Sequence, residues 1–286
     1  MSMENCVPKR EELRGGFLRV LEIDASQASD CDDTFERIRN GQLQGAIVHG
    51  VYPAELLAAV VERLERHDPP FLQTWFPSKF RSWFFGRNLN LAGPVLDGYF
   101  KESAVFARQL EALFPPHMGL DAHVSSILSA LDRGRSVTVA TGPNPGQHYM
   151  FATLRAHMEG GYIPAHFDNE QTIRPSYAHL RGLVGLHMTS FVLMLQKAEA
   201  GGTLEVYDVC CEPQDVYPIN DDRAKSKPSV GQVASAVFDI PAGSMIILDS
   251  GRYLHRVSPV EGTRKRWTAC SFMALSRQRD MTYCWG

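Results

Sequence analysis

The chain has 286 residues, of which 44% are hydrophobic and 21% charged, a composition typical of globular proteins with a large core. Its formal net charge of −3 argues against the basic surface that nucleic-acid binding requires. No apolar run reaches the 18 residues of a membrane-spanning helix, and the polar start of the chain lacks the apolar core of a signal peptide. We therefore expect a cytoplasmic enzyme or binding protein that acts neither on nucleic acid nor at a membrane. The sequence leaves its oligomeric state open.

The six cysteines show no Cys-x-x-Cys spacing, and Cys210 and Cys211 are adjacent. This pattern predicts free thiols rather than a disulfide framework or a zinc ribbon.

The first half of the chain is predicted to be mainly helical. Residues 1–44 read as a loosely structured arm with one short helix near residues 32–40, followed by a candidate strand at 45–52. A helix is predicted to start at Pro53, because apolar residues then recur at helical spacing (Leu56, Leu57, Val60, Val61 and Leu64). Two further amphipathic helices are expected at 96–114 and 121–132.

Residues 69–95 are rich in aromatic side chains but have no clean periodicity, and proline and glycine interrupt them. The segment is predicted to be a long loop or a broken helix. Its aromatic side chains either pack under a connection or form a wall over a ligand pocket.

From about residue 136 the pattern changes to short strands separated by turns. The strand candidates are rich in β-branched and aromatic residues: SVTVAT, YMFATLRAHME, GYIPAHFD, GLHMTSFVLMLQ, GTLEVYDV, SAVFDI, SMIILD, YLHRV and RWTACSFMAL. Helices followed by such strands predict an α+β fold, with a helical layer (45–135) packed on an antiparallel sandwich or barrel (136–286) in a single domain spanning 45–286. One connection, 211–235, is too long for a turn, and we expect either a lid or a disordered segment there.

Three residues have the types and spacing of a metal site. His166 and Asp168 are two positions apart in a predicted strand, so their side chains are expected on one face while Phe167 packs on the other. With His255 on a later strand they supply two imidazoles and one carboxylate, the facial triad that binds non-haem Fe(II).

An arginine and a threonine follow the last of these histidines. Arg266 and Thr268 alternate onto one face of the final predicted strand, where they could grip a carboxylate through a guanidinium fork and a hydroxyl. Arg264 is the rival for this role. Turning it inward as well would bury a second uncompensated cation, so Arg266 is preferred.

These motifs resemble the Fe(II)/2-oxoglutarate-dependent oxygenases, whose fold is the double-stranded β-helix, or jelly roll. The similarity is greatest to a subgroup containing the carrier-independent halogenases of the hapalindole and welwitindolinone pathways and the N-succinyl amino-acid hydroxylases. It covers the chain from about residue 45 to its end, and these segments carry it: GAIVHGVYP, ATLRAHMEGGYIPAHFDNE, EAGGTLEVYD, SGRYLHRVSPVEG and RWTACSFMALSRQRDMTYCW.

The resemblance implies Fe(II) bound by His166, Asp168 and His255, with 2-oxoglutarate and O2 as co-substrates. Arg266 and Thr268 would hold the far carboxylate of 2-oxoglutarate. In the halogenases a glycine occupies the position of Asp168 and leaves room for chloride, so the aspartate here implies hydroxylation of an unactivated C–H bond. The implied substrate is a small molecule, either an amino-acid derivative or a secondary metabolite.

Further residues carry over from the same subgroup. Arg155 matches an arginine that could support 2-oxoglutarate or the metal strand, although it could equally be an ordinary ion-paired residue. Arg81, Ser82 and Ile163 fall where the halogenases line their substrate pocket. We hypothesise that Arg81 or Arg87 meets an anionic or polar group of the substrate.

Several alternatives stay open. The same cofactors could drive desaturation, epimerisation or ring formation. A non-catalytic metal-binding jelly roll and a protein-modifying oxygenase are further possibilities, although the intact triad argues against the first and the aromatic segment against the second. Among the other histidines, His157 and His187 are expected to be hydrogen-bonded core residues.

Overall fold

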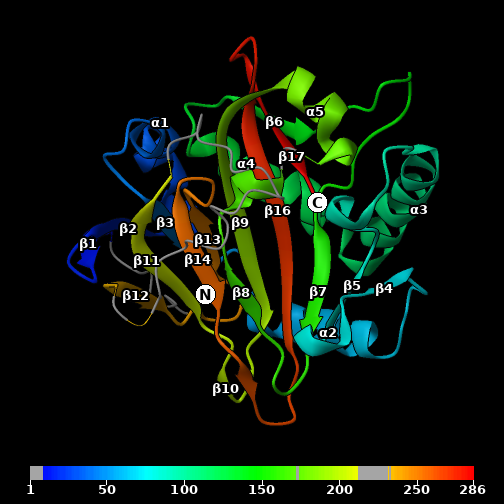
Figure 1. Cartoon of the computed structure of the whole chain (residues 1–286), viewed down its shortest axis with the longest axis horizontal. Helices are drawn as coiled ribbons and strands as arrows, with labels where there is room; N and C mark the ends of the chain where they lie inside the picture. Colours follow the sequence, from blue (N-terminus) through cyan, green and yellow to red (C-terminus); the bar gives the residue numbers. More distant parts are fainter. Residues whose placement is uncertain (1–8, 172–173, 212–230, 232) are drawn as a thin grey trace.

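The computed structural model describes residues 9–171, 174–211, 231 and 233–286, and it is built on two β-sheets. Eleven strands form the large sheet (Figure 1). Nine of them follow the order β1 (Arg10–Arg14), β2 (Leu18–Asp24), β3 (Gly45–His49), β13 (Met245–Leu248), β9 (Val184–Gln196), β16 (Arg266–Ser276), β7 (Thr153–His157), β5 (Ser82–Phe85) and β4 (Gln73–Trp75). Strand β17 (Met281–Trp285) pairs with both β16 and β6 (Ser136–Val139).

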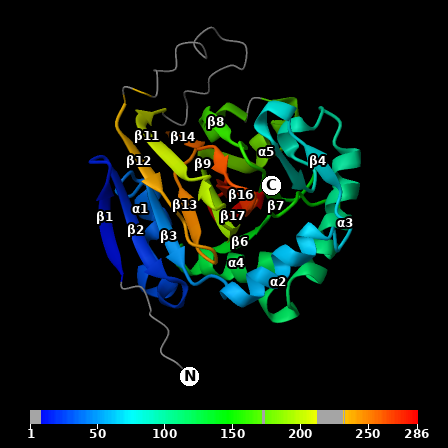
Figure 2. The ribbon, with the colours of Figure 1, turned by 90° about the horizontal axis from the view of Figure 1, so that it is seen from below.

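The small sheet has four strands in the order β12 (Ser235–Phe238), β11 (Leu204–Cys210), β14 (Tyr253–Val257) and β8 (Ile163–His166). A short pair of strands, β10 (Ala200–Gly201) and β15 (Val260–Glu261), lies apart from both sheets. Figure 2 shows the small sheet on one side of the large sheet, with helices on the other.

Alternation along the central strands assigns side chains to the two faces of the large sheet. Met194 and Ile246 of that sheet pack with Leu204 and Val206 of the small sheet, so this face forms the core between the sheets. The chain neighbours of Met194 and Ile246, such as Leu193 and Ile247, belong to a second core on the opposite face.

Helices cover that opposite face: α2 (Ala54–Glu65), α3 (Asp97–Leu113) and α4 (Leu120–Ala130) contribute buried side chains to the second core. In α2, for example, Leu57, Val60, Val61 and Leu64 form one buried stripe. The remaining helices are short: α1 (Thr34–Arg39), α5 (Ala178–Leu183) and the 3₁₀ turns η1 (Ala25–Cys31), η2 (Ser78–Phe80), η3 (Leu89–Leu91), η4 (Pro116–Met118), η5 (Asp168–Gln171) and η6 (Pro175–Tyr177). In the part of the chain that the structure covers, no helix is long and apolar enough to cross a membrane.

The predicted α+β fold is therefore confirmed, with helices packed on facing sheets whose central strands run antiparallel. The three long helices and all nine predicted C-terminal strands are present. Strand pairs β2–β3 and β6–β17 are parallel, however, so the large sheet is mixed.

Two segments differ from their predictions. The loose arm predicted over residues 1–44 is wrong for residues 10–24, which form β1 and β2 at the edge of the large sheet. The segment 69–95 is not a broken helix, because it contributes β4 and β5 to the other edge. Both segments acquire their structure by pairing with distant strands, which local periodicity does not record. Most of the predicted 211–235 connection lies outside the described residues.

A substitution at Gly243 can test how tightly the turn between β12 and β13 is packed. Its φ is +82°, and a Cβ there would lie 2.3 Å from the Tyr52 carbonyl oxygen. We expect Gly243→Ala to lower the free energy of unfolding by about 3 kcal/mol, because backbone strain and a steric clash add together. The measurement is equilibrium denaturation in urea.

Gly146→Ala is the matched control. Gly146 has a similar φ of +78° but no atom within 4 Å of the added Cβ, so only the strain of about 1 kcal/mol should appear. Equal losses in the two variants would contradict the packing described for this turn.

Candidate metal centre

Two histidines meet because β8 and β14 are neighbours in the small sheet. In this antiparallel pair His166 lies directly opposite His255, so both rings project from the same face. Their ring centroids are 4.4 Å apart. His255 also pairs with Val206 of β11, which belongs to the core between the sheets, so this face is the one turned toward the large sheet.

Asp168 reaches the same point from a different backbone conformation. Strand β8 ends at His166, and Asp168 opens the 3₁₀ turn η5, so the prediction that the aspartate lies on the strand is wrong. Its backbone N–H donates to the Ser250 carbonyl at 3.0 Å, which fixes the turn against the chain just before β14. Phe167 turns away, as predicted, and packs with Tyr207 and Leu254.

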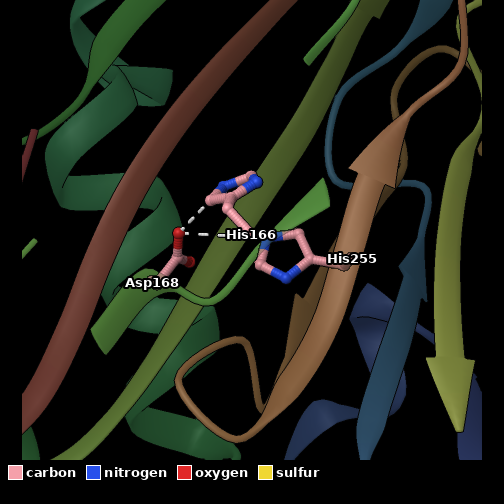
Figure 3. A group of neighbouring side chains, drawn as sticks. All are labelled: His166, Asp168 and His255. Atoms are coloured by element: carbon pink, nitrogen blue, oxygen red, sulfur yellow. Dashed lines mark ion pairs between the residues drawn. The ribbon is translucent and has the colours of Figure 1, made fainter. Parts of the chain in front are cut away.

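The three side chains are close enough to share one metal ion. The Asp168 Oδ1 atom lies 3.3 Å from His166 Nε2 and 3.9 Å from His255 Nε2 (Figure 3). One ligand atom from each residue falls within 4.8 Å of the other two. Two imidazole nitrogens and one carboxylate oxygen are the donor set of non-haem Fe(II) sites, so these residues fit such an ion.

Backbone contacts orient both rings for coordination. His166 Nδ1 is 2.8 Å from the Pro164 carbonyl oxygen, and His255 Nδ1 is 3.0 Å from that of Tyr253. Because a carbonyl can only accept, each Nδ1 carries the hydrogen in the neutral ring, and the Nε2 lone pair is directed to the common point.

Asp168 is buried, yet its carboxyl stays ionised. Burial alone would raise the pKa, but the interaction with His255 and a hydrogen bond with His166 outweigh it and lower the pKa of Asp168 to about 2. A divalent cation at the same point would stabilise the carboxylate in the same sense.

A basic cluster projects from the large sheet toward the small sheet, which carries both histidines. Thr268 pairs with Met194, a residue of the core between the sheets, while Trp267 and Ala269 belong to the core under the helices. Arg266 and Thr268 therefore face the small sheet. On the neighbouring strand β7, Arg155 lies opposite Thr268 and shares this face.

Arg266 is a buried cation without a counter-charge in the described part of the chain. Only 4% of the residue is exposed, its Nε has no hydrogen-bond partner, and no ion pair involves it within the described residues. Burial, helped by the charge of Arg155, lowers the pKa of Arg266 to about 10, so the side chain is still charged at neutral pH. A buried cation of this kind costs several kcal/mol unless an anion joins it.

The absence of a side chain at Gly202 leaves space for the Arg266 side chain. A Cβ at Gly202 would lie 2.8 Å from Arg266 Cδ, so a larger residue would displace the side chain. The rival Arg264 is exposed and donates instead to the backbone carbonyls of Lys197 and Ala198. An anion that enters between the two sheets would compensate the charge of Arg266.

The remaining predicted residues differ in their position and in whether their charge is compensated. Arg155 is half-buried over the Phe76 ring, with no ion-pair partner in the described chain. Ser82 is buried on β5, and Ile163 pairs with Val257 on the face that carries His255. The exposed Arg81, with a φ of +44°, lies against Gly160 just before β8.

Arg87 differs from these residues because its charge is already compensated. Its guanidinium forms an ion pair with Glu102 of α3, with a second contact of 2.6 Å between Nη2 and Oε1.

His157 was not among the predicted site residues, yet it joins the basic cluster. It lies opposite Arg266 on one neighbouring strand and Ser82 on the other. The predicted core hydrogen bond exists for His187, which contacts Asp249 at 2.7 Å, but neither ring nitrogen of His157 has a partner among the described residues. Its position two residues after Arg155 was the signal in the sequence.

Solved structures share this fold. An N-substituted L-amino acid dioxygenase from Burkholderia ambifaria AMMD in complex with alpha-KG matches with a TM-score of 0.54 and 11% identity, over 97% of this chain and 98% of that one. The same enzyme in another crystal structure gives the same values. A prolyl-4-hydroxylase from Pseudomonas putida matches with a TM-score of 0.45 and 13% identity, over 85% of this chain and 96% of that one. At 11% identity the likeness to the Burkholderia enzyme concerns the fold alone.

A comparison with curated proteins gives no match. The family model described as carrier-protein-independent halogenase WelO5 matches residues 17–286, which is nearly the whole chain. The chain therefore belongs to the family of the carrier-protein-independent halogenase WelO5.

Proposed function

We propose that this protein is an Fe(II)/2-oxoglutarate-dependent oxygenase that hydroxylates an unactivated C–H bond of a small molecule. The observation that carries the proposal is the grouping of Asp168 with two histidines of the small sheet, on the side that faces Arg266 of the large sheet, which has no acidic partner among the described residues. A metal site alone would also suit a binding protein. A buried cation beside it favours a dianionic co-substrate.

Each residue has a defined task in this proposal. His166, Asp168 and His255 hold the metal, while Arg266 and Thr268 hold the far carboxylate of 2-oxoglutarate. Arg155 adds positive potential next to Thr268. Bound together, the iron and its co-substrate supply O2 activation and the oxidising power for C–H cleavage. The protein positions these groups and keeps water from them between its two sheets.

Asp168 favours hydroxylation over halogenation. The family includes halogenases in which, by the resemblance described above, a glycine at this position leaves a metal site open for chloride. Here an ionised carboxylate occupies that place, and its negative charge disfavours a halide. Desaturation, epimerisation and ring formation would need the same residues, and no contact described here favours them.

The charges of the pocket support an anionic substrate. Arg155 and Arg266 contribute two positive charges without acidic partners in the described chain, iron two more, and Asp168 one negative charge. A bound 2-oxoglutarate dianion leaves one positive charge in excess. We therefore propose that a carboxylate of the substrate meets Arg81, the exposed arginine next to β8. An N-substituted L-amino acid, named for the Burkholderia enzyme, carries such a group.

We also propose that the protein acts in the cytoplasm. Cys31, Cys270 and Cys284 are free thiols, which suits a reducing compartment.

The role of Arg266 can be tested by anaerobic titration of the apo-protein with Fe(II) and 2-oxoglutarate. The chelate gives a weak visible charge-transfer band. Replacing the arginine by alanine should weaken 2-oxoglutarate binding by about 100-fold, because a buried charge-assisted contact is lost. Arg264→Ala, which removes the surface arginine two residues away, should bind as the wild type does. An unchanged affinity in Arg266→Ala would remove this residue from the site.

If Asp168 is a metal ligand, its replacement should change the coordination of the metal. Asp168→Gly should bind chloride or bromide at the metal, seen as a halide-dependent shift of the charge-transfer band, and should lose most hydroxylation. Asp168→Glu keeps the carboxylate and should show no halide dependence. Full hydroxylation by the glycine variant, without halide binding, would mean that Asp168 is not a ligand.

The proposal of an anionic substrate predicts different effects on KM for substitutions of Arg81 and Arg87. For a panel of N-substituted L-amino acids, Arg81→Ala should raise KM about tenfold, while the carboxamide derivatives should be poor substrates for wild type and variant alike. Arg87→Ala should leave KM unchanged, because Glu102 already compensates that charge. An unchanged KM in Arg81→Ala would contradict the proposal.

A further inference from the structure

His157 is a fully buried imidazole whose two ring nitrogens lack hydrogen-bond partners in the described part of the chain. Nitrogens buried without partners are costly, so native proteins rarely leave them unsatisfied. Such a side chain marks a place where water or a ligand completes the hydrogen bonding.

The position of the ring is set by its own strand, β7, and the strands on either side. Arg266 lies opposite His157 on β16, and Ser82 lies opposite it on β5. Arg155 lies two residues earlier on the same face of β7. A Cβ at Gly161 would approach His157 Cβ to 3.1 Å, so the backbone of that turn packs directly against the base of the side chain. The imidazole is therefore held beside the guanidinium of Arg266.

The same neighbours determine the protonation state of the ring. Burial, followed by the charges of Arg266 and Arg155, lowers the pKa of His157 well below 6.5. A neutral imidazole has one N–H donor and one acceptor nitrogen. It can therefore add a donor to the pocket without adding a third positive charge.

We propose that His157 donates a hydrogen bond to the far carboxylate of 2-oxoglutarate, the group that Arg266 and Thr268 also hold. This inference rests on the proposed function and assigns one more contact to its co-substrate site. A carboxylate between the two side chains accepts from both, satisfies an orphaned N–H of His157 and compensates the charge of Arg266.

The test measures binding rather than turnover. Isothermal titration calorimetry of the Fe(II) protein under nitrogen compares 2-oxoglutarate with oxalate, which can chelate the metal but has no far carboxylate. His157→Leu should weaken 2-oxoglutarate binding by about 10- to 100-fold and leave the affinities for oxalate and Fe(II) unchanged.

Two conservative variants identify the donating nitrogen. The amide nitrogen of His157→Asn mimics Nδ1, and that of His157→Gln mimics Nε2, so one of them should recover most of the lost affinity. The matched control is His179→Leu. His179 belongs to α5, which leads into β9 at Val184, and that residue pairs with Ser276 at the end of β16 farthest from Arg266.

A second measurement uses the unaltered protein and does not depend on how a variant folds. With ring-¹⁵N histidine and Zn(II) in place of Fe(II), the buried imidazole N–H of His157 should shift downfield when 2-oxoglutarate is added and stay in place with oxalate.

The outcomes separate the two proposals. If the wild type binds no 2-oxoglutarate, the proposed function itself fails. Wild-type binding with an unchanged His157→Leu affinity and an unmoved N–H signal would overturn only the role of His157 and leave water as its partner. An equal loss for 2-oxoglutarate and oxalate would also overturn that role, because the effect would then not depend on the far carboxylate.

Discussion

The pairing of β16 with β7 on one side and β9 on the other is the constraint on which the site depends. Because side chains alternate along β16, this register sends Arg266 and Thr268 toward the small sheet and Trp267 and Ala269 into the core beneath the helices. A shift by one residue would exchange the two sets. The tryptophan would then enter the space between the sheets, and the Arg266 guanidinium would face the apolar core under the helices. Core packing and the proposed co-substrate site therefore depend on the same hydrogen bonds between strands.

The proposed metal centre, in contrast, is not built on central strands, because its ligands come from the edge region of the small sheet. His166 closes the edge strand β8, His255 lies on the strand beside it, and Asp168 stands outside the ladder. In the proposed site two layers meet: the small sheet and its adjoining turn supply the metal ligands, and the large sheet supplies the cations. Burial of Asp168 on one side and of Arg266 on the other is unfavourable for each charge. A metal ion with an anionic ligand that reaches both sides would compensate the two charges.

Much of this architecture could be predicted from the sequence, and the exceptions have physical reasons. The period-two patterns of the C-terminal strands were sufficient to assign Arg266 and Thr268 to one face, and the alternation in His166-Phe167-Asp168 predicted that Phe167 would pack away from the metal ligands. Strands β1, β2 and β5 were missed because their conformation comes from pairing with distant partners. That His157 has no hydrogen-bond partner among the described residues could not be predicted either, because this depends on which residues of β16 and β5 lie opposite.

The position of Asp168 has a consequence for how such a scaffold diversifies. Its side chain leaves a 3₁₀ turn that is held by a backbone hydrogen bond to Ser250, and no strand pairing depends on it. The residue type at this point is thereby freed from the folding requirements that constrain the rest of the inner surface. An exchange of Asp168 for glycine would therefore leave both sheets in place and change only the donor set of the proposed metal site.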